Sequence, residues 1–227
     1  VYTTWSENFD NVATGNELPI CWTRIVNGSG TLSISNTSPA TAPNNLYFSS
    51  TTANNITYAV LPQLASVNAG THWLQYKARS SSSTIAVRPI IGYITDVTNT
   101  ATFVPLDTLT VSNNTYSVNY SYFIPPTTIP ANARLVIHNG FVNNTAFYFD
   151  DFSWLAMPSC VTPLATRSAV ISNTSCNLNW NTSVSNPTSY EYYYSTANAL
   201  PTATTTPSSV ATTNNVTVNN LTPDTKY

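Results

Sequence analysis

The chain has 227 residues, of which only 7% are charged, and its formal net charge is −2. No cluster of Lys and Arg favours nucleic acid or an anionic membrane, and no apolar run reaches the roughly 18 residues of a membrane-spanning helix. Ser, Thr and Asn supply about two residues in five, which favours strands and turns. This composition predicts an all-β protein without long amphipathic helices.

Short runs of β-forming residues, separated by turn-forming residues, follow one another along the first two thirds of the chain. Within residues 72–78, Leu74, Tyr76 and Ala78 share one face, and the residues between them share the other. This rhythm of short strands and turns is typical of a β-sandwich. The predicted strands lie at residues 46–48, 56–60, 72–78, 85–94, 102–111, 116–124, 134–138 and 146–155.

A domain boundary is predicted where Pro158 and Pro163 bracket a short segment, because strand pairing is hard to continue through prolines. The predicted domains are therefore residues 1–157 and 158–227. Further strands are expected at residues 176–180 and 189–194, and a loop rich in Thr, Pro and Ser follows after Leu200.

The cysteines and the start of the chain bear on its location. Cys21, Cys160 and Cys176 make an odd number, so one thiol is unpaired or pairs outside this sequence. With no CxxC motif and only two histidines, their spacing matches no metal site. The chain begins at Val1, as a processed secreted protein would, and we expect an extracellular, cell-surface location.

Three stretches resemble one family. They are ENFD at residues 7–10 followed by LPICW at 18–22, the predicted hairpin at 92–108, and FYFDDF at 147–152. In this order they resemble the MAM-like and cleaved-adhesin domains of secreted Bacteroidota proteins. The resemblance implies a jelly-roll β-sandwich over residues 1–157.

A second resemblance covers residues 160–227. LNW at residues 178–180, YEY at 190–192 and LTPDTKY at 221–227 resemble a fibronectin type III domain, which is an immunoglobulin-like sandwich. In that family the last motif leads into the sixth strand, so the resemblance implies a truncated domain without its last two strands. We therefore expect this part to be marginally stable alone, or to be held by another chain that supplies the missing edge.

Two adjacent acids, Asp150 and Asp151, lie in a predicted aromatic strand, where successive side chains point to opposite faces. A buried carboxylate without a partner is costly. The cleaved-adhesin resemblance implies a structural Ca²⁺ shared between Asp150 or Asp151 and Asp10 or Glu7, with Asn45 among the oxygens that complete the shell. The alternative is an acid that accepts hydrogen bonds from backbone amides, and both remain open.

The sequence offers little for catalysis. It lacks the GxSxG nucleophile motif. His72 lies in a predicted strand, and His138 directly precedes a predicted turn. Asp150 and Asp151 are expected on opposite faces and so cannot flank a glycoside-hydrolysing cleft. We therefore predict no enzymatic activity. Five tryptophans could form a sugar-stacking surface or fill the cores, and the scarcity of other large apolar residues favours the cores; they are Trp5, Trp22, Trp73, Trp154 and Trp180.

The Bacteroidota resemblance has further implications. The tripeptide DTL at residues 107–109 resembles the O-glycosylation signal of that phylum, which would place a glycan on Thr108. The predicted function is a non-catalytic surface adhesin module of a larger protein exported by a type IX-like route, with glycans, surface proteins and the secretion machinery as partners. One alternative is a carbohydrate-binding accessory region of a secreted polysaccharide-degrading enzyme. The other is a folded spacer.

Overall fold

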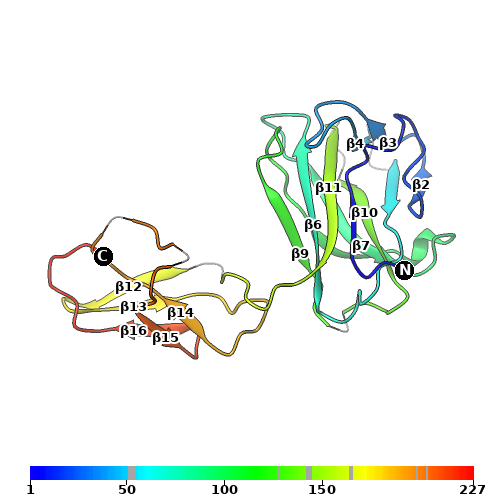
Figure 1. The fold of residues 1–227 in the computed structure, drawn as a ribbon. Coiled ribbons are helices and arrows are strands. Elements are labelled where there is room, and N and C mark those ends of the chain that lie inside the picture. The colour runs from blue at the N-terminus through cyan, green and yellow to red at the C-terminus, as the bar shows by residue number, and fades with distance from the viewer. Residues whose placement is uncertain (51–54, 127, 142–144, 164–165, 198, 203) are drawn as a thin grey trace. The chain divides into compact units, whose positions relative to one another are not determined.

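The computed structural model describes residues 1–50, 55–126, 128–141, 145–163, 166–197, 199–202 and 204–227. The chain forms two compact units, Val1–Ala156 and Met157–Tyr227, here called the N-terminal and C-terminal units (Figure 1). The described residues form strands and a single 3-10 turn, η1 (Thr100–Thr102), with no α-helix. The prediction of an all-β fold is confirmed. None of the described elements is a helix long and apolar enough to cross a membrane.

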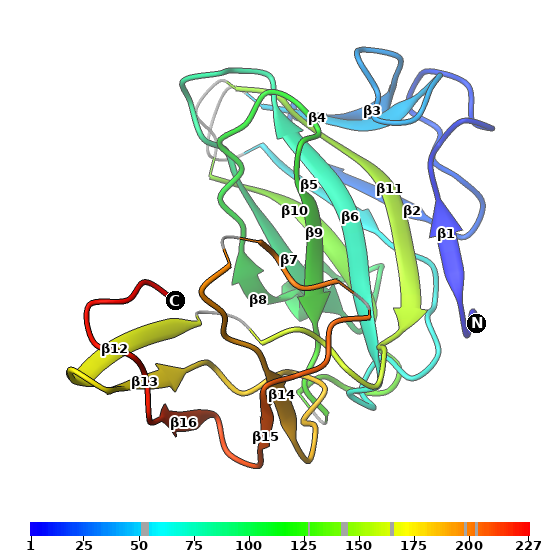
Figure 2. The same ribbon diagram turned by 60° about the vertical axis from the view of Figure 1, so that its left-hand side comes forward.

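The N-terminal unit is a sandwich of two antiparallel sheets, which Figures 1 and 2 show as two layers. The first sheet has the order β3-β4-β11-β6-β9, and β1 also pairs with β11. Its strands are β1 (Trp5–Glu7), β3 (Thr31–Ser35), β4 (Asn45–Ser49), β6 (His72–Ser80), β9 (Asn119–Phe123) and β11 (Phe147–Ala156). The second sheet has the order β2-β5-β10-β7-β8, with strands β2 (Thr23–Asn27), β5 (Ile56–Val60), β7 (Arg88–Ile94), β8 (Val104–Thr108) and β10 (Arg134–Phe141).

Alternating residues from both sheets meet in one core. Leu74, Tyr76 and Ala78 of β6 are buried there, as their spacing predicts, and Ile91 and Leu135 reach the same core from the second sheet. Burying an aliphatic or aromatic side chain contributes roughly 1.5–3 kcal/mol, so this shared core is the main source of the unit's stability. The aromatic strand β11 supplies four of its large aromatic members, which are Phe147, Phe149, Phe152 and Trp154.

A β-bulge interrupts β11 between Asp150 and Ser153, and Asp151 has a positive φ of 50°. On one side β11 pairs with β6 on both flanks of the bulge. The other edge is shared, because β4 pairs with the residues before the bulge and β1 with those after it. Figure 2 shows β1 beside the later part of β11. Asp150 and Asp151 therefore lie where the pairing of β11 with β4 ends and its pairing with β1 begins.

The C-terminal unit contains two small antiparallel sheets. One has the order β12-β13-β16, formed by β12 (Arg167–Ser172), β13 (Ser175–Asn179) and β16 (Asn215–Val218). The other pairs β14 (Tyr190–Tyr192) with β15 (Ser209–Ala211). Among the described residues of this unit, the buried apolar side chains are Trp180, Ala211 and Val218. The fibronectin type III identity of this unit stays a prediction.

Candidate functional site

Asp150 is the most deeply buried acid of the described chain, with no exposed surface. One carboxylate oxygen accepts hydrogen bonds from the amides of Ala40 (2.7 Å) and Thr41 (3.2 Å), and the other accepts one from the amide of Asp151 (2.8 Å). No described Lys, Arg or His forms an ion pair with it. Burial raises the pKa of Asp150 to about 7, although the three amides oppose the shift. The carboxylate thus fixes the loop between β3 and β4, residues 36–44, to the bulge.

Asp151 reaches the same loop. Its Oδ1 accepts a hydrogen bond from the Thr41 hydroxyl (2.8 Å), and its Oδ2 lies 2.9 Å from the ammonium of Lys77. Both acids therefore contact Thr41, and the expectation that they point to opposite faces is wrong. The reason is the bulge, which inserts a residue and breaks the strict alternation of the strand.

The acids near the first strand lie at the far end of that loop. Asp10 accepts hydrogen bonds from the side-chain amide of Asn8 (2.7 Å) and the backbone amide of Asn44 (3.3 Å). Glu7 instead turns back to the amide of Phe9 (2.7 Å), and burial raises the pKa of Glu7. The loop is therefore held by Asp150 near its middle and by Asp10 at its end.

Asn45, directly after this loop, is fully buried. Its amide nitrogen donates to the carbonyl of Thr37 (2.9 Å), whereas its Oδ1 has no hydrogen-bond partner among the described residues. The Arg79 guanidinium also donates to the Thr37 carbonyl (2.6 Å) and lies 3.7 Å from the ring centroid of Tyr148. Arg79 was not among the predicted site residues, although its alternation with Gln75 and Lys77 places it on the outer face of the first sheet.

These contacts allow a test of how well the predicted calcium ligands suit a cation. Among the described residues Asp150 has no cation partner and the Asn45 side-chain oxygen has no hydrogen-bond donor, so these two suit Ca²⁺. Asp10 accepts a hydrogen bond at each oxygen, from Asn8 at 2.7 Å and from Asn44 at 3.3 Å, and a cation could take the place of the longer one. Asp151 and Glu7 suit it less, because Lys77 and the Phe9 amide already occupy them. The described residues contain no group of three or more His, Cys, Asp or Glu side chains that could hold a metal. The calcium site stays a prediction.

The two histidines are packed against aromatic rings. His138 is buried and stacks on Phe103 (5.1 Å between ring centroids), and its Nδ1 accepts a hydrogen bond from the Gly140 amide (2.8 Å). Burial lowers the pKa of His138 to about 4, so it is neutral near pH 7. His72 stacks on Trp154, with ring centroids 5.3 Å apart. Among the interactions of the described residues, neither ring contacts an acid.

The outer face of the first sheet, defined by Trp73, Gln75, Lys77, Ser121 and Phe123, carries polar and aromatic side chains. Gln75 donates a hydrogen bond to the Ser121 hydroxyl (3.0 Å), and Trp73 lies opposite Phe123 in the strand register. Trp73 is half-buried. Of the other tryptophans, Trp5 is also half-buried, and the remaining three are buried as the core interpretation expects.

The predicted glycosylation site and the three cysteines lie apart from the acids, the histidines and the outer face of the first sheet. Thr108 is exposed at the end of β8, an edge strand, and its amide donates to its neighbour Asp107 (2.7 Å). All three cysteines are free thiols, with Cys21 and Cys160 exposed and Cys176 half-buried.

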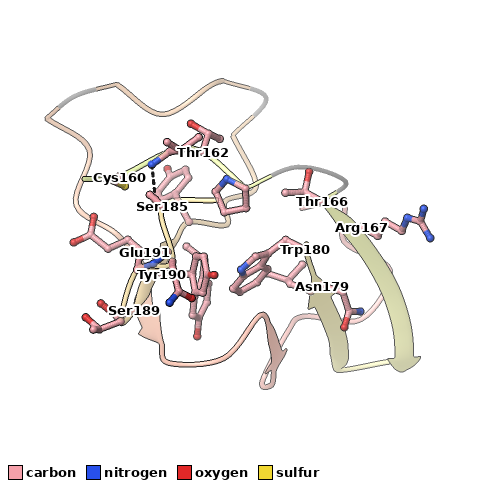
Figure 3. Close-up of a pocket in the computed structure, with 18 of the residues that line it drawn as sticks. Cys160, Thr162, Thr166, Arg167, Asn179, Trp180, Ser185, Ser189, Tyr190 and Glu191 are labelled. Carbon is pink, nitrogen blue, oxygen red and sulfur yellow. Dashed lines mark hydrogen bonds between the residues drawn. The ribbon is translucent and has the colours of Figure 1, made fainter. Parts of the chain in front are cut away.

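The C-terminal unit contains an open hollow of about 1090 Å³ (Figure 3). Trp180 and Tyr190 both line it and pack edge to face against each other, with ring centroids 5.3 Å apart and the rings at 65°. Cys160 and Thr162 belong to the segment along its rim, where the Val161 amide donates to the Ser185 hydroxyl (3.0 Å). Leu178 also lines the hollow and is half-buried.

Comparison with known proteins supports the fold of the N-terminal part. No protein-family model matches the chain, and no curated protein matches it. The K1 cleaved adhesin domain of Lys-gingipain from Porphyromonas gingivalis superposes with a TM-score of 0.52 at 13% identity, covering 69% of this chain and 99% of that domain. The K3 cleaved adhesin domain of the same protein gives a TM-score of 0.51 at 13% identity, covering 66% of this chain and 97% of that domain. The chain therefore shares the β-sandwich fold of the cleaved adhesin domains, as the sequence motifs predict.

Proposed function

We propose that this chain is a non-catalytic extracellular module of a larger surface protein, in which the N-terminal unit binds its target as an adhesin. The observation that carries the proposal is the fold, which matches nearly the whole length of a cleaved adhesin domain. The contacts of the acids and histidines support it. Asp150 and Asp10 hold a loop, Asp151 pairs with Lys77, and His138 is buried and neutral.

The outer face of the first sheet is the proposed binding surface. Gln75 and Ser121 supply amide and hydroxyl groups, Lys77 supplies a charge, and Trp73 and Phe123 supply aromatic surface. Because sugars are bound by such combinations of hydrogen-bonding groups and ring faces, this surface also favours the second candidate function, a carbohydrate-binding accessory region of a secreted polysaccharide-degrading enzyme. A folded spacer would need no such surface.

Calcium, secretion and glycosylation belong to the same proposal. A structural Ca²⁺ bound by Asp150, Asp10 and the Asn45 side-chain oxygen would neutralise the buried carboxylate and tighten the β3–β4 loop. Export by a type IX-like route would place the module at the cell surface. Thr108, exposed at a sheet edge, is accessible to a glycosyltransferase.

Binding of the purified 227-residue chain to a glycan array and to immobilised host surface proteins tests the proposal. We expect binding without turnover, weakened about tenfold or more by Ser121→Arg, which puts a long charged side chain at the centre of the outer face. Ala101→Arg, an exposed position in η1, is the matched control and should leave binding unchanged. Turnover of a polysaccharide or peptide that one substitution abolishes would contradict the proposal, as would binding that Ser121→Arg leaves intact.

A further inference from the structure

The two sheets of the N-terminal unit end in the edge strands β1, β2, β3, β8 and β9. An edge strand exposes backbone N–H and C=O groups to pairing with another chain, and proteins protect such edges with short strands, charged residues, prolines or bulges. β1 has only three residues, and β2 contains Arg24. β8 contains Pro105 and Asp107 and has a register shift against β7. Along β3, the backbone of Gly15 pairs with Ile34. Each of these four edges is therefore protected against further pairing.

The remaining edge strand, β9, has none of these protective features. Its five residues, Asn119–Phe123, include no proline and no charged side chain, and they pair with β6 in an unbroken register. Figure 1 shows β9 at the margin of the first sheet, beside β6. No other strand of the described residues pairs with β9, and the turn and loop hydrogen bonds of the described chain do not involve its backbone. The N–H and C=O groups on its outer edge are therefore open to pairing.

We propose that the free edge of β9 pairs with β9 of a second copy of this chain, antiparallel about a two-fold axis at Ser121. In this register Ser121 lies opposite its own counterpart, and Tyr120 lies opposite Tyr122 of the second copy. Because the axis runs perpendicular to the sheet, the first sheets of both copies would form one continuous sheet with their outer faces on the same side. The proposed binding surfaces of the two copies would then lie side by side.

The side chains of β9 suit pairing with a second copy. Tyr120 and Tyr122 are half-buried at the margin of the core, where Tyr120 stacks on Tyr76 with ring centroids 5.6 Å apart. Aromatic residues directly opposite each other stabilise an antiparallel pair, and the two-fold axis would create two such Tyr120–Tyr122 pairs. Ser121 is exposed and uncharged, so the like side chains that meet at the axis do not repel each other. The strand is therefore complementary to itself and carries no charge that would select an acidic or basic partner.

The expected dimer is weak. Pairing through one five-residue strand is short, so we expect an interface at or below the roughly 1,200 Å² that marks the lower end of stable complexes. A protein displayed in many copies at a surface, as proposed above, has a high local concentration that favours such pairing. Two adjoining outer faces would also bind a repetitive target more tightly than one face alone.

Sedimentation velocity of the full chain, over about a hundredfold range of concentrations up to about 0.5 mM, tests this inference. We expect a reversible dimer at the upper end of the range. Ser121→Lys and Ser121→Glu each place like charges opposite each other at the axis, so each variant alone should dimerise about fivefold more weakly than the native chain. An equimolar mixture of the two variants places Lys opposite Glu, so it should dimerise more tightly than either variant alone.

Ser153 supplies the matched control. It lies in the same row as Gln75 and Ser121, but on the interior strand β11, where it pairs with β1 on one side and β6 on the other. Ser153→Lys and Ser153→Glu should therefore leave dimerisation unchanged. A chain that stays monomeric over the whole range would overturn the inference. A dimer that both Ser121 variants leave intact, or a mixture no tighter than the single variants, would also overturn it, because the two Ser121 side chains would then not meet. These readouts do not involve the target of the outer face, so such a failure would leave the proposed function standing.

Discussion

The two units are built from similar strands but differ in how well their apolar residues are covered. Leu74, between the two sheets of the N-terminal unit, is 0% exposed, whereas Leu178 of the C-terminal unit is half-buried beside the open hollow. In the first unit both sheets have five strands or more, but in the second a two-stranded sheet faces a three-stranded one. Apolar alternation forms a strand in both cases. What differs is how much of the strand's apolar face the described residues opposite it cover.

The largest expected effect comes from one substitution made in both units. Leu74→Ala removes a fully buried side chain and should lower the free energy of unfolding of the N-terminal unit by about 2–5 kcal/mol. Leu178→Ala removes a side chain that is already half in solvent and should cost about 1 kcal/mol. Calorimetric unfolding of the two variants measures both. Equal losses would show that the C-terminal core is as closed as the first.

Protonation of histidine should affect only one unit, because both histidines lie in the N-terminal unit. The pKa of folded His138 is about 4, against roughly 6.5 in the unfolded chain, so the unfolded state binds the proton first as the pH falls. The contribution of His138 to stability is therefore fully present above about pH 6.5, and up to about 3 kcal/mol of it is lost toward pH 4. The raised pKa of Asp150, about 7, acts in the opposite direction over the same range, because the folded state then binds the proton first.

Chemical denaturation of the native chain and of His138→Gln between pH 7 and pH 4 isolates the loss due to His138 as the difference between the two, since Gln does not titrate and Asp150 is present in both. The same pH dependence in both proteins would contradict the prediction and assign the acid sensitivity to other groups.

Calcium should also distinguish the units. If Ca²⁺ binds Asp150, Asp10 and Asn45 in the folded state only, a concentration of about 100 Kd should stabilise the N-terminal unit by roughly 2.7 kcal/mol and leave the other unfolding transition unchanged. Asp150→Asn should abolish the response to Ca²⁺, whatever its effect on the starting Tm. A Tm of the N-terminal unit that neither EDTA nor added Ca²⁺ changes would contradict the calcium proposal.

The smallest effect concerns the ion pair between Lys77 and Asp151. Both side chains are partly exposed, at 32% and 24%, so Lys77→Met should cost about 0.2–1 kcal/mol. High salt should reduce the difference between the variant and the native chain, because it screens exposed charges. A difference that persists in 1 M salt, where the Debye length is about 3 Å, would assign the loss to the packing of the lysine stem instead.

The strands that the sequence predicted are those with a clear alternation. The residues of β5 were predicted in full, and β6 extends only two residues beyond its prediction, because each has a regular pattern of β-forming residues. Six strands were missed. In the N-terminal unit, β1 has only three residues, β2 is interrupted by Arg24, and β3 consists mostly of Ser and Thr. In the C-terminal unit, β12, β15 and β16 were missed, and β15 lies within the segment predicted as a loop. The predicted strand at 102–111 is shorter, since η1 occupies its beginning and β8 ends at Thr108.

The site could be predicted only in part. The importance of Asp150 follows from a carboxylate in an apolar strand, but its partners Ala40 and Thr41 lie about 110 residues away, and no local pattern indicates them. The bulge that turns Asp151 to the same loop could not be predicted either, because it depends on how β4 and β1 share one edge of β11. Local sequence predicts alternation, whereas these contacts depend on the tertiary arrangement.

Hydrogen exchange in the intact chain tests most directly whether the two cores differ in closure. The amides of residues 72–78 lie in a central strand over the closed core of the N-terminal unit. Those of residues 178–194 lie beside the open hollow of the C-terminal unit. We expect the second group to exchange at least about a hundredfold faster, equivalent to roughly 3 kcal/mol in opening free energy. If both groups exchanged at the same rate, the core of the C-terminal unit would be as closed as that of the N-terminal unit, which would contradict the difference described above.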